Sequence, residues 1–191
     1  MVAGRWSANK QKQHKTMNLI DSIQIPVGYE HYWRLKAIDN HDFTEVKRKV
    51  AQETGNKDAA YLDKGILYLK RYYAMLVLDP LNPATMSLPV DPFWHFHTLF
   101  THQYIAFSNH VFGEYVHHIP LLEDDAFAVQ AVSALYEAMV KKQHLIFKDV
   151  DPTFVPADPA KGRCCTPSIL ANPTLRADAL FAGDKPMRWK L

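Results

Sequence analysis

Apolar residues recur at helical intervals along several segments of the chain. Between residues 29 and 53 they alternate with charged residues, and the polar run DNHD at positions 39–42 interrupts the pattern, which therefore predicts two short helices. From residue 57 to about residue 78 the apolar positions become dense on every side, which predicts a central, buried helix. Pro80 and Pro83 end that helix, because proline lacks an amide hydrogen and disfavours helix in the residue before it.

A third helical segment is expected to begin at Asp91-Pro92. Aspartate can accept hydrogen bonds from the unpaired amides of a helix start, and proline suits the first helical position. The pattern allows this helix to run to about His117, and Pro120 prevents it from going much further. The aromatic core face of the helix is formed by Phe93, Phe96, Phe100, Tyr104, Phe107 and Val111.

The remainder of the chain predicts one more helix and an irregular end. Two aspartates at positions 124–125 place negative charge at the start of that helix, and Lys141-Lys142 places positive charge near its other end. Few segments alternate with the two-residue period of a strand, so we predict an all-α, single-domain helical bundle. We expect a basic N-terminal arm over residues 1–28, a helical domain over residues 29–148, and an irregular, proline-rich tail over residues 149–191 that packs on it.

Composition and charge exclude several classes of protein. A length of 191 residues with 48% apolar and 22% charged residues is typical of one globular domain. No apolar run approaches the roughly 20 residues that a membrane span needs, and no signal peptide opens the chain, so we expect a cytoplasmic protein without a membrane segment. The net charge of +2 gives no general reason to expect nucleic acid as a partner, although residues 5–15 are locally basic.

The histidines are concentrated, because six of the ten lie within one stretch of thirty residues. They can form a metal or proton-handling site, or they can pack and cap a helix. On an unbroken helix, His95 and His102 share a face but lie about 10.5 Å apart along the axis, too far to chelate one ion directly. His97 points in a different direction, at the edge of the aromatic face. His117 or His118 could approach the helix start only if the chain turned back or a second chain contributed.

Other catalytic signals are weak. Cys164 and Cys165 are adjacent, a spacing unlike the CxxC pairs of zinc knuckles or redox enzymes. They can be two unpaired thiols in a loop, a strained vicinal disulfide, or the source of one thiolate ligand. No nucleophile motif surrounds them, and phosphate-binding and dinucleotide fingerprints are absent. Whether the protein is an enzyme is therefore left open.

The histidine-rich stretch resembles a motif of the glycine-rich domain-containing protein-like family, which comprises plant proteins and uncharacterised bacterial relatives. The matching residues are Asp91, Trp94, His95, His97, Leu99, Tyr104, Phe112, Gly113, His117, His118 and Pro120. The likeness covers about residues 61–120. It implies a helical fold and selects motif residues, but it implies no reaction. With seven glycines in the whole chain, this sequence has no glycine-rich region.

Two functions fit these observations. The first is a helical binding or scaffold module built around the WHxH…HHxP motif, which locks helix ends together and meets a protein partner. The alternative is a metal-binding protein, possibly a metalloenzyme, in which His95 with His117 or His118 holds Zn²⁺ or non-haem Fe²⁺. Tyr104 could then be an outer hydrogen-bond partner of the metal site. The candidate metal ligands are Asp91, His95, His97, His117 and His118. The oligomeric state stays open.

Overall fold

The computed structural model describes residues 18–82 and 84–167, and these residues are mostly helical. The helices are α1 (Leu19–Ser22), α2 (Tyr29–Asn40), α3 (Thr44–Thr54), α4 (Ala59–Leu78), α5 (Asp91–Leu99), α6 (Thr101–Phe112), α7 (Ala126–Ile146) and α8 (Pro159–Gly162). Two three-residue strands, β1 (His118–Pro120) and β2 (Cys165–Pro167), pair in antiparallel fashion. The all-α prediction is confirmed. No helix in the described part of the chain is both long and apolar enough to cross a membrane.

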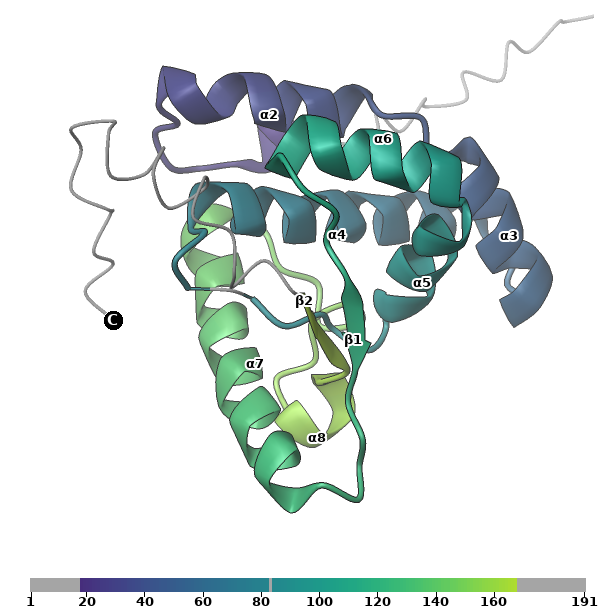
Figure 1. Cartoon of the computed structure of the whole chain (residues 1–191), viewed down its shortest axis with the longest axis vertical. Coiled ribbons are helices and arrows are strands. Elements are labelled where there is room, and N and C mark those ends of the chain that lie inside the picture. Colours follow the sequence, from purple (N-terminus) through teal and green to yellow (C-terminus); the bar gives the residue numbers. More distant parts are fainter. Residues whose placement is uncertain (1–17, 83, 168–191) are drawn as a thin grey trace, which may run out of the picture.

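Helix α4 forms the centre of the molecule. Helices α2 and α6 run along one side of it, whereas α7, α8 and the strand pair lie on the other side (Figure 1). Every residue from position 71 to position 78 is buried, which confirms the predicted central helix. Helix α5 packs closely on α4 at Gly65, where a side chain larger than hydrogen would collide with the ring of Phe93. This close approach fixes the position of α5, which carries the first half of the motif.

The two short helices predicted over residues 29–53 are confirmed as α2 and α3. Gly55 ends α3 with a φ of 69°, a left-handed conformation that glycine adopts without strain. At the start of α7, the side chain of Asp125 accepts hydrogen bonds from the amides of Phe127 and Ala128, as the acidic start signal predicted.

The prediction of one continuous helix from Asp91 to about His117 is wrong. Phe100, with φ −79° and ψ 60°, separates α5 from α6. Helix α6 then ends at Phe112, because Gly113 adopts a φ of 82° and turns the chain away from the helix axis. Hydrophobic periodicity did not reveal these breaks because the aromatic residues continue at helical spacing across the first of them.

The structure describes part of the predicted N-terminal arm and part of the predicted C-terminal tail. Residues 1–17 of the N-terminal arm lie outside the described residues, and within the rest of that arm α1 packs on the helical body with Leu19 fully buried. The tail is described as far as residue 167, and it is tied to the body by Arg71 of α4, whose buried guanidinium donates 2.7 and 2.8 Å hydrogen bonds to Asp149. Residues 168–191 of the tail lie outside the described range.

Candidate functional site

Asp91 and His118 bring the two halves of the motif together. The chain reverses after Gly113, so that β1 passes beside the start of α5. His118 Nε2 lies 2.7 Å from Asp91 Oδ1. The prediction that Asp91 caps its helix is wrong, because Asp91 is the first residue of α5, the capping position is Val90, and no side chain caps the helix. The Asp91 carboxylate is instead directed to the returning strand.

The two cysteines lie beside the contact between Asp91 and His118. Strand β2 pairs with β1, and the Cys165 thiol donates to Asp91 Oδ1 at 3.3 Å. One oxygen of Asp91 and the two sulfurs of Cys164 and Cys165 all lie within 4.8 Å of one another. Burial acts to raise the pKa of Asp91, but hydrogen bonds from His118 and from the two thiols outweigh it and hold that pKa below its usual value. The pKa of the Cys165 thiol is raised by its hydrogen bond with Cys164 and by burial.

Trp94 and Tyr104 pack in the interior next to Asp91 and His118. Both side chains are fully buried. Trp94 Nε1 donates to the Tyr104 hydroxyl at 3.0 Å, and that hydroxyl donates to the carbonyl of Val116 at 2.6 Å. The indole ring of Trp94 also lies 4.7 Å from the ring of His118, measured between centroids. These contacts connect α5, α6 and the segment that leads into β1.

His97 belongs to a second, separate network. It points away from Asp91 into an aromatic interior, as its predicted position at the edge of the core face suggested, and its side chain is fully buried. His97 Nε2 lies 3.2 Å from His41 Nε2, and His97 Nδ1 lies 2.9 Å from the Tyr73 hydroxyl. Burial lowers the pKa of His97 to about 3, and burial also lowers the pKa of His41. The network is therefore uncharged at neutral pH.

The hydrogen-bond directions in the second network follow from its burial. Within the part of the chain that the structure describes, the Tyr73 hydroxyl has no polar partner besides His97 Nδ1. A buried hydroxyl must donate its hydrogen to avoid a large desolvation cost, so Tyr73 donates to His97 Nδ1. The remaining hydrogen of His97 then lies on Nε2, and His97 donates to His41 Nε2. We expect His97 to be the Nε2–H tautomer.

The remaining motif histidines lie on the surface. His95 is exposed, and its ring centroid is 5.9 Å from that of His118. His117 is also exposed, and its ring packs on Tyr115 at 4.6 Å. The predicted metal ligands are thus divided among three environments, and Asp91 and His118 are within hydrogen-bond distance of each other. The structure therefore does not bring the five predicted ligands together at one site.

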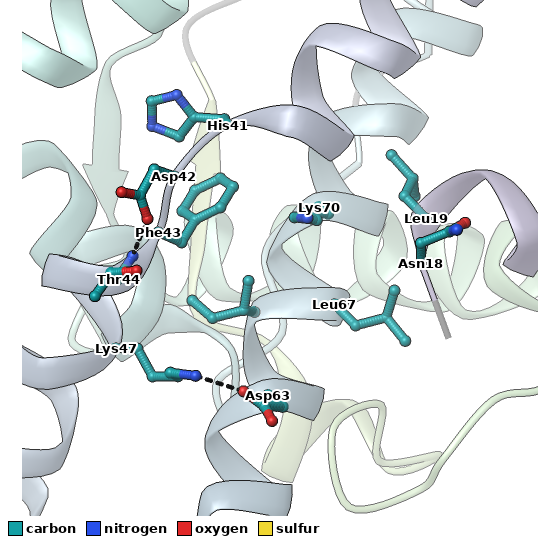
Figure 2. Close-up of a pocket in the computed structure, with 11 residues that line it drawn as sticks. Asn18, Leu19, His41, Asp42, Phe43, Thr44, Lys47, Asp63, Leu67 and Lys70 are labelled. Carbon is teal, nitrogen blue, oxygen red and sulfur yellow. Dashed lines mark hydrogen bonds and ion pairs between the residues drawn. The ribbon is translucent and has the colours of Figure 1, made fainter. Parts of the chain in front are cut away.

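A cavity of about 360 Å³ opens where α3 begins beside α4, and His41 forms part of its wall (Figure 2). Three of the four lysine and aspartate side chains that line it are paired, and the fourth, Asp42, accepts a 2.9 Å hydrogen bond from the amide of Thr44. Lys47 Nζ lies 2.6 Å from Asp63, and Lys70 donates to the backbone carbonyl of Asp39 at 2.7 Å. Because these ions are neutralised internally, the cavity offers a charged ligand little electrostatic attraction.

A second, apolar hollow lies between the strand pair and α7. This groove has a volume of about 210 Å³ and is lined by Ile119, Pro120, Leu121, Leu122, Asp125, Ala128, Val132, Cys165 and Thr166. Two of the large apolar side chains that line it are exposed to solvent, namely Ile119 at 47% and Leu122 at 65%. Sequence reasoning missed this surface, because it depends on β1 lying beside β2.

Comparison with known proteins corrects the family assignment. The family model described as UCP032817-like matches residues 33–148, more than half of the chain. No curated protein and no solved structure matches the chain. The resemblance to the glycine-rich domain-containing protein-like family is therefore wrong as an identification. It rested on a short motif whose residues make the local packing and hydrogen-bond contacts described above, and such contacts do not identify a family.

Proposed function

This chain belongs to the UCP032817-like family, and we propose that it is a helical protein-binding module in which the WHxH…HHxP motif shapes the docking surface. The observation that carries this proposal is the groove between the strand pair and α7, with the exposed side chains of Ile119 and Leu122 in its lining. Exposed apolar clusters of this kind mark interaction surfaces. The small volume of the groove suits a short segment of a partner.

The charges near the groove favour one kind of partner. Glu123 and Asp124 follow directly after Leu122, and both are exposed. Glu123 is paired with Arg163 at 2.9 Å, but 66% of its side chain remains accessible. A complementary segment would insert apolar side chains into the groove and place lysine or arginine beside these carboxylates. We therefore infer that the partner is a protein segment with apolar residues flanked by basic ones.

His118 and Tyr104 of the motif support this surface, whereas Pro120 lines the groove itself. The bond of His118 to Asp91 holds β1 against the start of α5, and the bond of Tyr104 to Val116 holds the segment just before β1. His118 and Tyr104 therefore act as scaffold, and the exposed contact residues of the proposed interface are Ile119 and Leu122.

Selection from a random peptide library tests this proposal. Peptides selected on the wild-type protein should be rich in large apolar residues together with lysine or arginine. Replacing Leu122 with alanine should weaken the strongest selected peptide by about 30-fold, which corresponds to the loss of roughly 2 kcal/mol at an interface anchor. The dissociation constants would be measured by isothermal titration calorimetry.

Tyr29→Ala provides the control, because Tyr29 is another large exposed side chain, with 90% exposure, and lies on α2 away from the groove. It should leave the peptide affinity unchanged. Selected peptides that bind Leu122→Ala as tightly as wild type, or that lose equal affinity in both variants, would contradict a binding site at the groove.

A further inference from the structure

We propose that Asp91, His118, Cys164 and Cys165 form a structural Zn²⁺ site. The site goes beyond the proposed partner binding and does not depend on it. It differs from the ligand set that the sequence suggested, because it omits His95, the buried His97 and the surface residue His117. The two cysteines, which follow Asp91 by more than seventy residues, replace them.

The geometry brings Asp91 and the two cysteines together, and His118 adjoins this group through Asp91. His118 Nε2 is 2.7 Å from Asp91 Oδ1, and Cys165 Sγ is 3.3 Å from the same oxygen. Cys164 Sγ lies within 4.8 Å of both that sulfur and the carboxylate. Ligand atoms on a tetrahedral zinc ion with bonds of about 2.0–2.3 Å are separated by about 3.3–3.8 Å. The Cys165–Asp91 distance already fits this range, whereas the His118 ring would have to turn from its present bond with Asp91 so that it faces the ion and the sulfurs.

A metal ion would take the place of the hydrogens that now join Asp91 to His118 and Cys165. The Asp91 carboxylate accepts hydrogen bonds from the His118 ring and from the Cys165 thiol. A divalent cation would replace such protons and satisfy the same lone pairs, so binding would release protons from the thiols. The carboxylate and two thiolates would then place three negative charges around the two positive charges of the ion, which offsets most of the electrostatic cost of placing it in a partly buried position.

The donor set selects zinc among the common metals. Two thiolates and one imidazole suit Zn²⁺, whereas Mg²⁺ and Ca²⁺ require oxygen ligands. A carboxylate as the fourth ligand is compatible with zinc, and four protein ligands fill its tetrahedral coordination. A site with no open position is structural and not catalytic, so this inference predicts no hydrolytic activity.

The backbone holds the four ligands firmly from both sides. The carbonyl of Cys164 accepts from the amide of Leu121 at 3.2 Å, and the carbonyl of Cys165 accepts from the amide of Met86 at 3.0 Å. The indole of Trp94 packs against the His118 ring. Such support limits the reorganisation needed on binding. A bound ion would join the start of α5, β1 and β2, three segments that are far apart in the sequence.

Metal titration of untagged full-length protein tests the inference. Protein stripped with chelator under reducing conditions should bind one equivalent of Zn²⁺ per chain and melt at a higher temperature when loaded. With Co²⁺ as a spectroscopic substitute, we expect thiolate-to-cobalt charge-transfer bands in the near ultraviolet and the intense visible bands of a tetrahedral complex. Cys164→Ser and Asp91→Asn should each weaken Zn²⁺ by at least about 100-fold, since removing even an outer-shell partner costs 10–100-fold.

His117→Gln is the matched control, because His117 is the neighbour of His118 on the same chain segment and lies outside the ligand set. It should retain one equivalent of Zn²⁺ and the cobalt spectrum. Circular dichroism would confirm that Cys164→Ser, a conservative change at a half-buried position, remains folded. Folded wild-type protein that binds no Zn²⁺, or that binds Co²⁺ without thiolate bands, would overturn the inference. Equal Zn²⁺ affinity in wild type and Cys164→Ser would do the same.

Discussion

Replacing Trp94 with alanine should lower the free energy of unfolding by about 3–5 kcal/mol, as expected for removal of a fully buried indole. Trp94 is 0% exposed and packs on Tyr72 and His118, with ring centroids 5.0 and 4.7 Å away. The change would leave a large cavity, and the Tyr104 hydroxyl would lose the hydrogen bond that it accepts from the indole. Urea denaturation followed by circular dichroism measures the effect.

Trp33→Ala is the control for this change. Trp33 lies on α2 with 45% exposure, so its loss should cost much less, on the order of 1 kcal/mol. Similar destabilisation by the two substitutions would show that Trp94 does not have the central packing role that its burial indicates.

Acidification should destabilise the protein through His97. Burial lowers its pKa in the folded protein to about 3, whereas an unfolded histidine has a pKa of about 6.5. Between these two values the unfolded chain binds more protons than the folded one, so stability is fully present above pH 6.5 and decreases as the pH falls toward 3. The decrease approaches 1.4 kcal/mol per pH unit, which gives about 2 kcal/mol between pH 6.5 and pH 5. His41, whose pKa is also lowered, acts in the same direction.

The test compares urea unfolding of wild type and His97→Gln across this pH range. Glutamine can still form hydrogen bonds with Tyr73 and His41, but it does not titrate. The variant should be less stable than wild type at pH 7 and should show a shallower dependence on pH below 6.5. A pH dependence identical to that of wild type would mean that His97 is not the buried neutral group.

Much of the fold could be predicted from the sequence, because local periodicity and end signals determine most of its helices. The dense apolar pattern placed α4 correctly, and Asp125 marked the start of α7 through the physics of helix capping. The breaks at Phe100 and Gly113 were not predicted. An aromatic residue has no strong tendency to end a helix, and glycine ends one only when its left-handed conformation is used.

The candidate sites were less predictable because they depend on contacts between distant segments. The sequence indicated that His95 and His97 face different directions, and it allowed His118 to return to the helix start if the chain turned back. It could not indicate which residues would meet them. Pairing of β1 with β2 brings Cys165 to Asp91, and the corner after α2 brings His41 to His97. Both contacts join residues more than fifty positions apart, for which local patterns contain no signal.

The motif histidines serve separate structural networks, and His97 is neutral and hydrogen-bonded in the interior. Long-range ¹H–¹⁵N NMR spectra of histidine side chains near pH 5 test this arrangement most directly, because an imidazole with the usual pKa of about 6.5 is then mostly protonated. The His97 signal is assigned as the one that is missing from the spectrum of His97→Gln. We expect His97 to remain neutral, with its hydrogen on Nε2 and an unprotonated Nδ1. A His97 signal showing both nitrogens protonated at that pH would contradict this arrangement.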